Sequence, residues 1–230
     1  MTNRILVLAA TVAFFTSSCM WIRTGEQPTG PTVNEQGFSL LTEAGIAQIK
    51  RTKHARFDLR STQLTKTAVG LQNSSYSPMI GHAGGGEMTF TFLGPTAREE
   101  VITENITFVT SSITNTVETI VWFSAPKDIA AAHTELRAGV NRWGFRNQDV
   151  ERWITNSAKR EQDKESLGMG IGPTGLVVDV TARKKNGNEI YQYGIHLDPR
   201  YYTPETQQTI RETGKSIRWP PTTTTGPPPR

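Results

Sequence analysis

Residues 117–145 constrain the fold of this chain more than any other stretch. They begin with an apolar run of strand length, TIVWF at 119–123, and continue into a predicted helix. Ser124 is a suitable N-cap for that helix, Pro126 suits its first turn and Gly144 suits its C-terminal stop. Apolar residues then recur at spacings of 3, 4, 4 and 3, at Ile129, Ala132, Leu136, Val140 and Trp143. The pattern predicts a helix that packs on a sheet through one face.

Four more helices are predicted from apolar spacing and cap residues. The first has Thr42 as its N-cap and an apolar stripe of Leu40, Leu41, Ile46 and Ile49. The second covers residues 58–71, and the third covers 147–165, whose last part is the charged run KREQDKE. A short final helix covers 204–213 and ends at Gly214.

The strands are predicted from alternation and from turn residues. Residues 87–93 alternate as a strand, and parts of 102–120, rich in Thr, Ile and Val, are predicted as exposed strand. Residues 176–183 and 189–197 flank the sequence Asn186-Gly187, a strong hairpin signal. The combination predicts an α+β fold, a single domain with an antiparallel sheet and helices packed on one face.

The first 19 residues have the pattern of an export signal that ends at a lipid-attachment cysteine, Cys19. Arg4 supplies a positive start, and residues 5–15 form an apolar segment that is followed by three small polar residues. As a helix, the apolar segment would cover about 16 Å, short of a hydrocarbon core of about 30 Å. The pattern predicts a signal peptide cleaved before Cys19, and a lipid anchor at the outer face of the cell membrane.

An uncleaved anchor is the alternative interpretation of the same segment. Residues 5–22, counted together, would form roughly 27 Å of helix. Bacterial lipoprotein signals also usually carry Leu, Val or Ile three residues before the cysteine, where this chain has Thr16. Cys19 is nevertheless the only cysteine, and it falls where a lipoprotein signal requires one.

The rest of the composition limits the possible chemistry. With no other cysteine, the body has no disulfide, thiolate zinc site or cysteine nucleophile. A net charge of +4 suits an anionic membrane surface at least as well as nucleic acid, and we predict no nucleic-acid partner, cofactor or metal. Residues 20–37 are predicted as a flexible tether, 38–219 as the folded body and 220–230 as a disordered Pro/Thr-rich tail, whose composition suits O-glycosylation.

The densest basic run lies between the first two predicted helices. It contains Lys50, Arg51, Lys53, Arg56 and Arg60. One interpretation is a solvated helix end, because the helix dipole favours Lys and Arg near a C-terminus. The other is a surface that contacts an anionic lipid, a cell-wall polymer or another envelope protein.

No catalytic motif is evident. The sequences G-x-S-x-G and H-E-x-x-H are absent, and Gly170, Gly172 and Gly175 match G-x-G-x-x-G but open a strand, not a helix. His133 and Glu135 form H-x-E, but a zinc deaminase would also need P-C-x-x-C. We therefore predict a non-catalytic binding or interaction role. An envelope hydrolase whose catalytic groups meet only in space is the alternative.

The layout resembles the LppA-like family of mycobacterial lipoproteins. The resemblance rests on the cysteine at the end of the signal, the early segment LLTEAGIAQIKRTKHARFDLRSTQLTKTA and the segment FSAPKDIAAAHTELRAGVNRWGF. The stretch NSAKREQD at 156–163, the late hairpin and the WPPTTTT tail complete it. It implies an α+β body at the cell envelope and supplies no catalytic residues.

Overall fold

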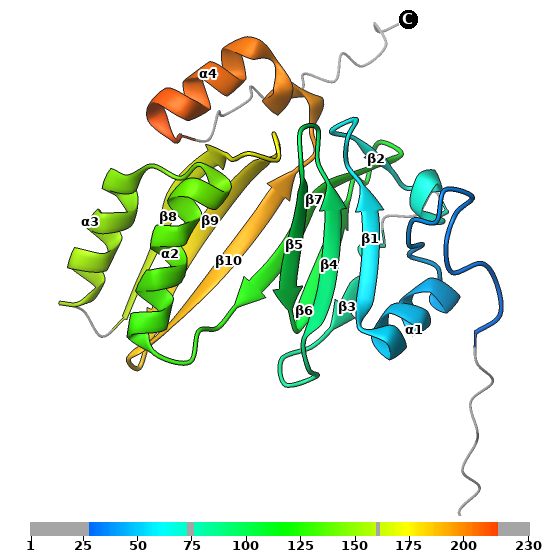
Figure 1. The fold of residues 1–230 in the computed structure, drawn as a ribbon, viewed down its shortest axis with the longest axis horizontal. Helices are drawn as coiled ribbons and strands as arrows, with labels where there is room; N and C mark the ends of the chain where they lie inside the picture. Colours follow the sequence, from blue (N-terminus) through cyan, green and yellow to red (C-terminus); the bar gives the residue numbers. More distant parts are fainter. Residues whose placement is uncertain (1–27, 73–75, 160–161, 216–230) are drawn as a thin grey trace, which may run out of the picture.

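The computed structural model describes residues 28–72, 76–159 and 162–215 (Figure 1). These residues form four α-helices and ten β-strands, and the helices pack against strands. The arrangement confirms the predicted α+β fold class. The predicted signal and Cys19 lie outside the described residues, as does the tail at 220–230.

The strands form two sheets. The larger sheet is antiparallel, with the order β3-β6-β7-β10-β9-β8 and with β2 paired to β7. Its strands are β2 (Leu64–Thr65), β3 (Met79–Gly81), β6 (Asn105–Thr110), β7 (Thr116–Ser124), β8 (Gln162–Ile171), β9 (Val177–Lys185) and β10 (Asn188–His196). The smaller sheet has the order β1-β4-β5, formed by β1 (His54–Asp58), β4 (Met88–Leu93) and β5 (Arg98–Thr103). It is mixed, because β1 runs parallel to β4.

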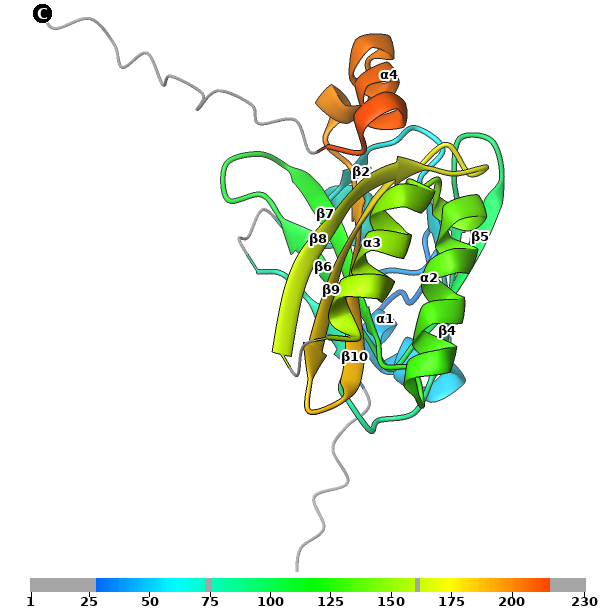
Figure 2. The same cartoon turned by 90° about the vertical axis from the view of Figure 1, so that its left-hand side faces the viewer.

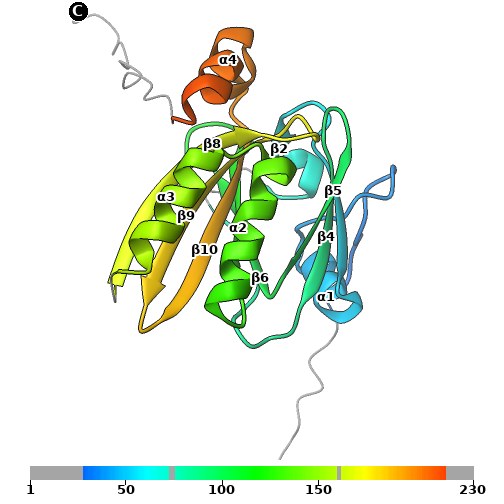
Figure 3. The ribbon, with the colours of Figure 1, turned by 60° about the vertical axis from the view of Figure 1, so that its left-hand side comes forward.

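Two different layers cover one face of the larger sheet. Helices α2 (Ile129–Trp143) and α3 (Asn147–Ser157) lie over β8, β9 and β10 (Figures 2 and 3). The smaller sheet lies beside α2 over β6 and β7, where the ring centroids of Phe57 and Phe108 are 4.7 Å apart. One continuous core therefore fills the space under both layers, from Leu41 to Leu197.

The remaining helices lie at the margins of the larger sheet. Helix α1 (Glu43–Thr52) lies at the β1 side, and a 3-10 turn (Thr67–Val69) follows β2. Helix α4 (Pro204–Thr213) follows a second 3-10 turn (Pro199–Tyr202). Ile210 of α4 packs on Met169 and Val177 in a small separate cluster at the end of β8 and β9.

The predicted strand and helix at 117–145 are present, but the helix starts later than expected. Ala132, Leu136 and Trp143 are buried as predicted, and Gly144 ends the helix in the left-handed conformation with φ of 76°. Ser124 is not the N-cap, because it still pairs with Tyr191 as the last residue of β7. The cap is Asp128, whose side chain accepts a hydrogen bond from the backbone N–H of Ala131.

The predicted helix at 58–71 is wrong. The first helix is correct and has Thr42 as its N-cap, but residues 54–58 then form β1 and 64–65 form β2. Asp58 and Ser61 explain the break, since their side chains accept hydrogen bonds from the backbone N–H groups of Arg60 and Gln63. Such local bonds compete with a helix. The apolar residues Leu59 and Leu64 are buried as expected, but Leu59 follows β1 and Leu64 lies in β2.

The C-terminal half agrees better with the sequence. Asn186 and Gly187 both have positive φ, 52° and 77°, as a two-residue type I′ hairpin requires. Helix α4 and its stop at Gly214 are correct. Helix α3, however, ends at Ser157, and part of the charged run predicted as helix begins β8 instead.

The glycines of the G-x-G-x-x-G match have a packing role. A Cβ on Gly172 would lie 2.1 Å from the carbonyl oxygen of Arg142, and one on Gly170 would lie 2.4 Å from that of Trp143. Distances this short do not occur between such atoms, so only glycine lets the end of α2 approach β8. The close packing of these two glycines on the end of α2 accounts for their presence, and no nucleotide site is needed to explain it.

Ordered structure begins before the predicted body boundary at residue 38. The side chain of Asn34 accepts a hydrogen bond from the N–H of Phe38, and Val33 pairs with Ser39 in an isolated bridge. Residues 33–39 therefore form a folded turn against the body, although 20–37 were predicted as a tether.

Candidate binding site

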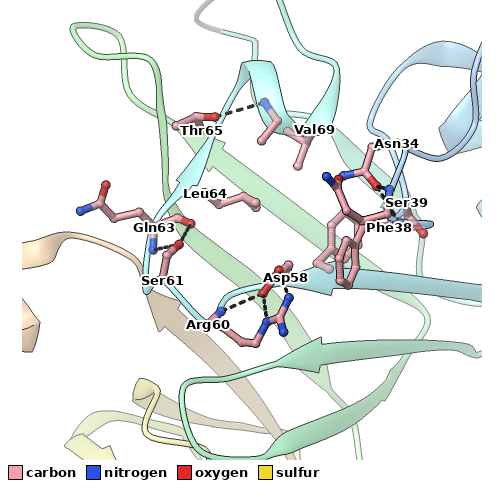
Figure 4. Close-up of a pocket in the computed structure, with 13 residues that line it drawn as sticks. Asn34, Phe38, Ser39, Asp58, Arg60, Ser61, Gln63, Leu64, Thr65 and Val69 are labelled. Atoms are coloured by element: carbon pink, nitrogen blue, oxygen red, sulfur yellow. Dashed lines mark hydrogen bonds and ion pairs between the residues drawn. The ribbon is translucent and has the colours of Figure 1, made fainter.

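A pocket of about 490 Å³ opens at the carboxyl end of β1 (Figure 4). It lies between the turn that precedes α1 and the segment 60–69. Four almost fully buried apolar side chains contribute to its lining: Phe38, Phe57, Leu64 and Val69. A volume of this size is within the range of small-ligand pockets in proteins.

Polar groups surround this apolar lining. Arg60 donates two hydrogen bonds to Asp58, at 2.9 Å from Nε and 2.7 Å from Nη2. These bonds lower the pKa of the Asp58 carboxyl below its usual value, so the pair is ionised at neutral pH. Ser61, Gln63 and Asn34 supply further polar atoms (Figure 4). The pocket therefore suits an amphipathic ligand with a small apolar part.

Three of the predicted contact residues lie at the end of α1. Lys50 and Arg51 are exposed in its last turn. Lys53 follows in the left-handed conformation, with φ of 61°, and its Nζ donates to the carbonyl oxygen of Gly85 at 3.1 Å. The position of Lys50 and Arg51 is the one that the helix dipole favours.

Of the other two predicted contact residues, one lies on β1 and one follows it. Arg56 is exposed in the middle of the strand, and its guanidinium carbon is 5.1 Å from the ring centroid of Phe38. Arg60 follows the far end of β1 and lines the pocket, where Asp58 neutralises it. The five residues therefore do not form one patch. Lys50, Arg51 and Lys53 precede β1, and Arg60 follows it.

The sequence did not reveal a buried polar cluster around Glu189, whose side chain is 0% exposed. Its carboxylate accepts hydrogen bonds from Trp153 Nε1 at 3.0 Å, Ser157 Oγ at 2.9 Å and Tyr191 OH at 2.5 Å. His133 Nε2 lies 3.4 Å from the same carboxylate. These residues come from α2, α3 and β10, so their spacing in the sequence carries no signal.

The cluster holds Glu189 in its ionised form. Burial alone would raise the pKa of this carboxyl, but the hydrogen bonds from Tyr191, Trp153 and Ser157 outweigh burial and lower it. Burial and the contact with Glu189 raise the pKa of Tyr191 far above its usual value. Because this carboxylate is fully buried, its hydrogen bonds join α3 to the sheet and it does not face a substrate.

The structure brings two histidines next to carboxylates. His133 lies beside Glu189, and His196 Nε2 lies 3.1 Å from Asp179 Oδ1. Within the described ranges, neither imidazole is hydrogen-bonded to a serine or threonine hydroxyl. The same residues contain no cluster of three or more His, Cys, Asp or Glu suited to a metal ion. The geometry described therefore contains no assembled nucleophile, base and orienting acid.

Comparisons with known proteins give no assignment. No protein-family model, curated protein or solved structure matches this chain. In the part of the chain that the structure describes, no helix combines the length and the apolarity that crossing a membrane requires.

Proposed function

We propose that this chain is a membrane-anchored lipoprotein of the cell envelope that binds a partner without catalysis. In this proposal the signal peptide is cleaved before Cys19, and lipid on Cys19 holds the body at the outer face of the cell membrane. The export-signal pattern, the single cysteine and the LppA-like layout of the sequence support the anchor. The ligand-sized pocket beside β1, which contains no nucleophile–base pair, supports the binding role.

The point where the chain enters the body is the observation that carries this proposal. Thr42 Oγ donates to the carbonyl oxygen of Pro31 at 3.1 Å, and the N–H of Leu40 donates to that of Thr32 at 3.0 Å. The chain therefore enters beside α1, the helix whose last turn holds Lys50 and Arg51 (Figure 1). A tether that leads from this point keeps α1 within reach of the surface that holds the anchor.

Anionic lipid headgroups are the partner that best suits this geometry. Each exposed Lys or Arg near an anionic membrane contributes roughly 1 kcal/mol of attraction. Lys50, Arg51 and Arg56 are exposed, and none of them is ion-paired among the described residues. A cell-wall polymer or another envelope protein would offer a different surface to the same residues, and binding assays with vesicles distinguish these cases.

Charge reversal at α1 and β1 tests the binding surface. We expect the variant with Lys50→Glu, Arg51→Glu and Arg56→Glu to bind anionic vesicles at least about tenfold more weakly, because three attractions become repulsions. Lys53 is left unchanged because its Nζ holds Gly85. Co-sedimentation of a soluble chain that starts at residue 28 measures the effect.

The matched control carries Lys164→Glu, Arg183→Glu and Arg211→Glu, which change the net charge by the same amount. These three residues are exposed on β8, β9 and α4, away from α1. The control is expected to retain most of the affinity. Equal losses in the two variants would show that net charge alone governs binding and would contradict the assigned surface.

Replacing Cys19→Ala tests the anchor. We expect loss of lipid labelling, because the variant has no cysteine to carry lipid. The protein should then be released or accumulate as an uncleaved precursor, because at least two acyl chains are needed for stable anchoring. Metabolic labelling with a fatty-acid analogue, followed by gel mobility and membrane fractionation, measures both effects. Equal labelling and mobility of wild type and variant would exclude Cys19 as the lipidated residue.

A further inference from the structure

A second cavity lies at the seam between the two layers that cover the larger sheet. Its volume is about 240 Å³, and it is lined by residues of β5, β7, α2 and β10. Figure 3 shows this seam, with β5 and α2 side by side above the larger sheet. The cavity is separate from the pocket at the end of β1, and the proposed binding role does not use it.

Three aromatic side chains line the cavity. The ring centroid of Trp122 lies 5.2 Å from that of Tyr193 and 5.8 Å from that of Trp143. Each of these residues is only 3% exposed, so the structure holds each ring in place. The face of an aromatic ring carries partial negative charge and attracts cations.

Glu135 adds a carboxylate to this aromatic lining. It projects from α2 and accepts hydrogen bonds from Ser124 Oγ and Tyr193 OH, both at 2.7 Å. Both donors are neutral, and no cationic side chain of the described residues lies within 4.0 Å of its carboxylate oxygens. Burial and the Glu135 carboxylate together raise the pKa of the Tyr193 hydroxyl well above its usual value. The negative charge of Glu135 is therefore satisfied by hydrogen bonds but not neutralised.

Arg142 also lines the cavity, but its polar contacts are with β5. Its Nε donates to Glu99 Oε1 at 2.9 Å, and its Nη2 donates to the carbonyl oxygen of Glu100. Its guanidinium carbon also lies 4.7 Å from the ring centroid of Trp143. Arg142 therefore closes one side of the cavity against β5 and forms no ion pair with Glu135.

We propose that this cavity binds a compact organic cation, specifically a methylated ammonium group. Such a group combines attraction to the Glu135 carboxylate with contact to the rings of Trp122, Trp143 and Tyr193. The small volume suits one ammonium head and not a large molecule. The cation could come from a free small molecule or from a choline headgroup, which share this chemistry.

The test compares choline with 3,3-dimethylbutan-1-ol, its neutral isostere, by calorimetry on the full chain in a non-ionic detergent. We expect choline to bind at least about tenfold more tightly, since only choline carries the charge. Phosphocholine is measured as a third ligand. If phosphocholine binds more tightly than choline, the cavity recognises a lipid headgroup. If it binds equally or more weakly, the cavity recognises the free cation. Equal affinity of choline and its isostere for wild type would overturn the proposal without any variant.

Glu135→Gln removes the charge and is expected to abolish the preference for choline over the isostere. The matched control is Glu118→Gln, since Glu118 is exposed on the same strand as Trp122 and does not line the cavity. It is expected to leave choline binding unchanged. Thermal unfolding followed by circular dichroism confirms that both variants are folded. Unchanged choline binding by a folded Glu135→Gln variant would also overturn the proposal.

Discussion

Replacing Glu189→Ala is expected to destabilise the fold by about 3 to 5 kcal/mol, because it leaves three buried donors without an acceptor. These donors are Trp153 Nε1, Ser157 Oγ and Tyr191 OH, all within 3.0 Å of the carboxylate. Urea unfolding followed by tryptophan fluorescence measures the change. The cost is large because Glu189 joins α3 to β10, and neither side of this junction is open to water.

Glu165→Ala is the matched control for this measurement. Glu165 is also a carboxylate bonded to a side chain of α3, but its pair with Arg152 is partly exposed and should contribute less than about 1 kcal/mol. If the two alanine variants lose similar stability, the buried cluster does not have the structural role assigned to it.

The same cluster predicts a dependence of stability on pH. The pKa of Glu189 is lower in the folded protein than its ordinary value of 4.5, so folding favours the ionised form. The resulting stabilisation is fully present above the unfolded-state pKa and is lost as pH falls through the folded-state pKa. Glu189→Gln should therefore show a smaller loss of stability in acid than the wild type does.

Replacing Leu136→Ala is the second change with a large expected effect, about 2 to 4 kcal/mol. Leu136 is 0% exposed on the face of α2 that packs on the sheet, so truncation opens a cavity in the core. Chemical denaturation followed by circular dichroism measures the cost. Arg137→Ala is the control, because its exposed ion pair with Glu151 is screened by solvent and its loss should cost far less than a core cavity. Similar losses in both variants would contradict the assigned core face of α2.

In the sequence, Glu135 is simply the polar neighbour of Leu136 on the predicted helix. The structure shows instead that Glu135 is hydrogen-bonded to Ser124 and Tyr193 inside the seam cavity. Helical periodicity correctly predicted that Ala132, Leu136 and Trp143 are buried, but it also predicted Ile129, which is exposed. It could not identify a polar residue whose partners lie on two distant strands.

Local patterns predicted the elements whose stabilising contacts are local. The hairpin at Asn186 and Gly187 follows from their positive φ, and α4 ends at Gly214 for the same reason. β1 was missed because its partner is β4, and a parallel pairing with a strand some 35 residues away leaves no local pattern. The wrong helix at 58–71 came from the apolar residues that follow β1, Leu59, Leu64, Ala68 and Leu71, whose spacing resembles a helical one.

The candidate site was predictable only in part. The sequence predicted the basic residues as contacts, but it could not show that Arg60 pairs with Asp58 or that Lys53 bonds to Gly85. The pocket itself is formed by the turn before α1 and the segment after β1, and the prediction treated these as a tether and a helix. A tether and a helix give no reason to expect a cavity between them.

The most direct test of the binding role is the affinity of the soluble chain from residue 28 for vesicles, compared between anionic and zwitterionic lipid over a range of salt concentrations. We predict binding to anionic vesicles that weakens steadily as salt rises, since exposed charges are screened over about 8 Å at physiological ionic strength. Equal binding to both kinds of vesicle, unaffected by salt, would contradict the account. Absence of binding to either would contradict it as well.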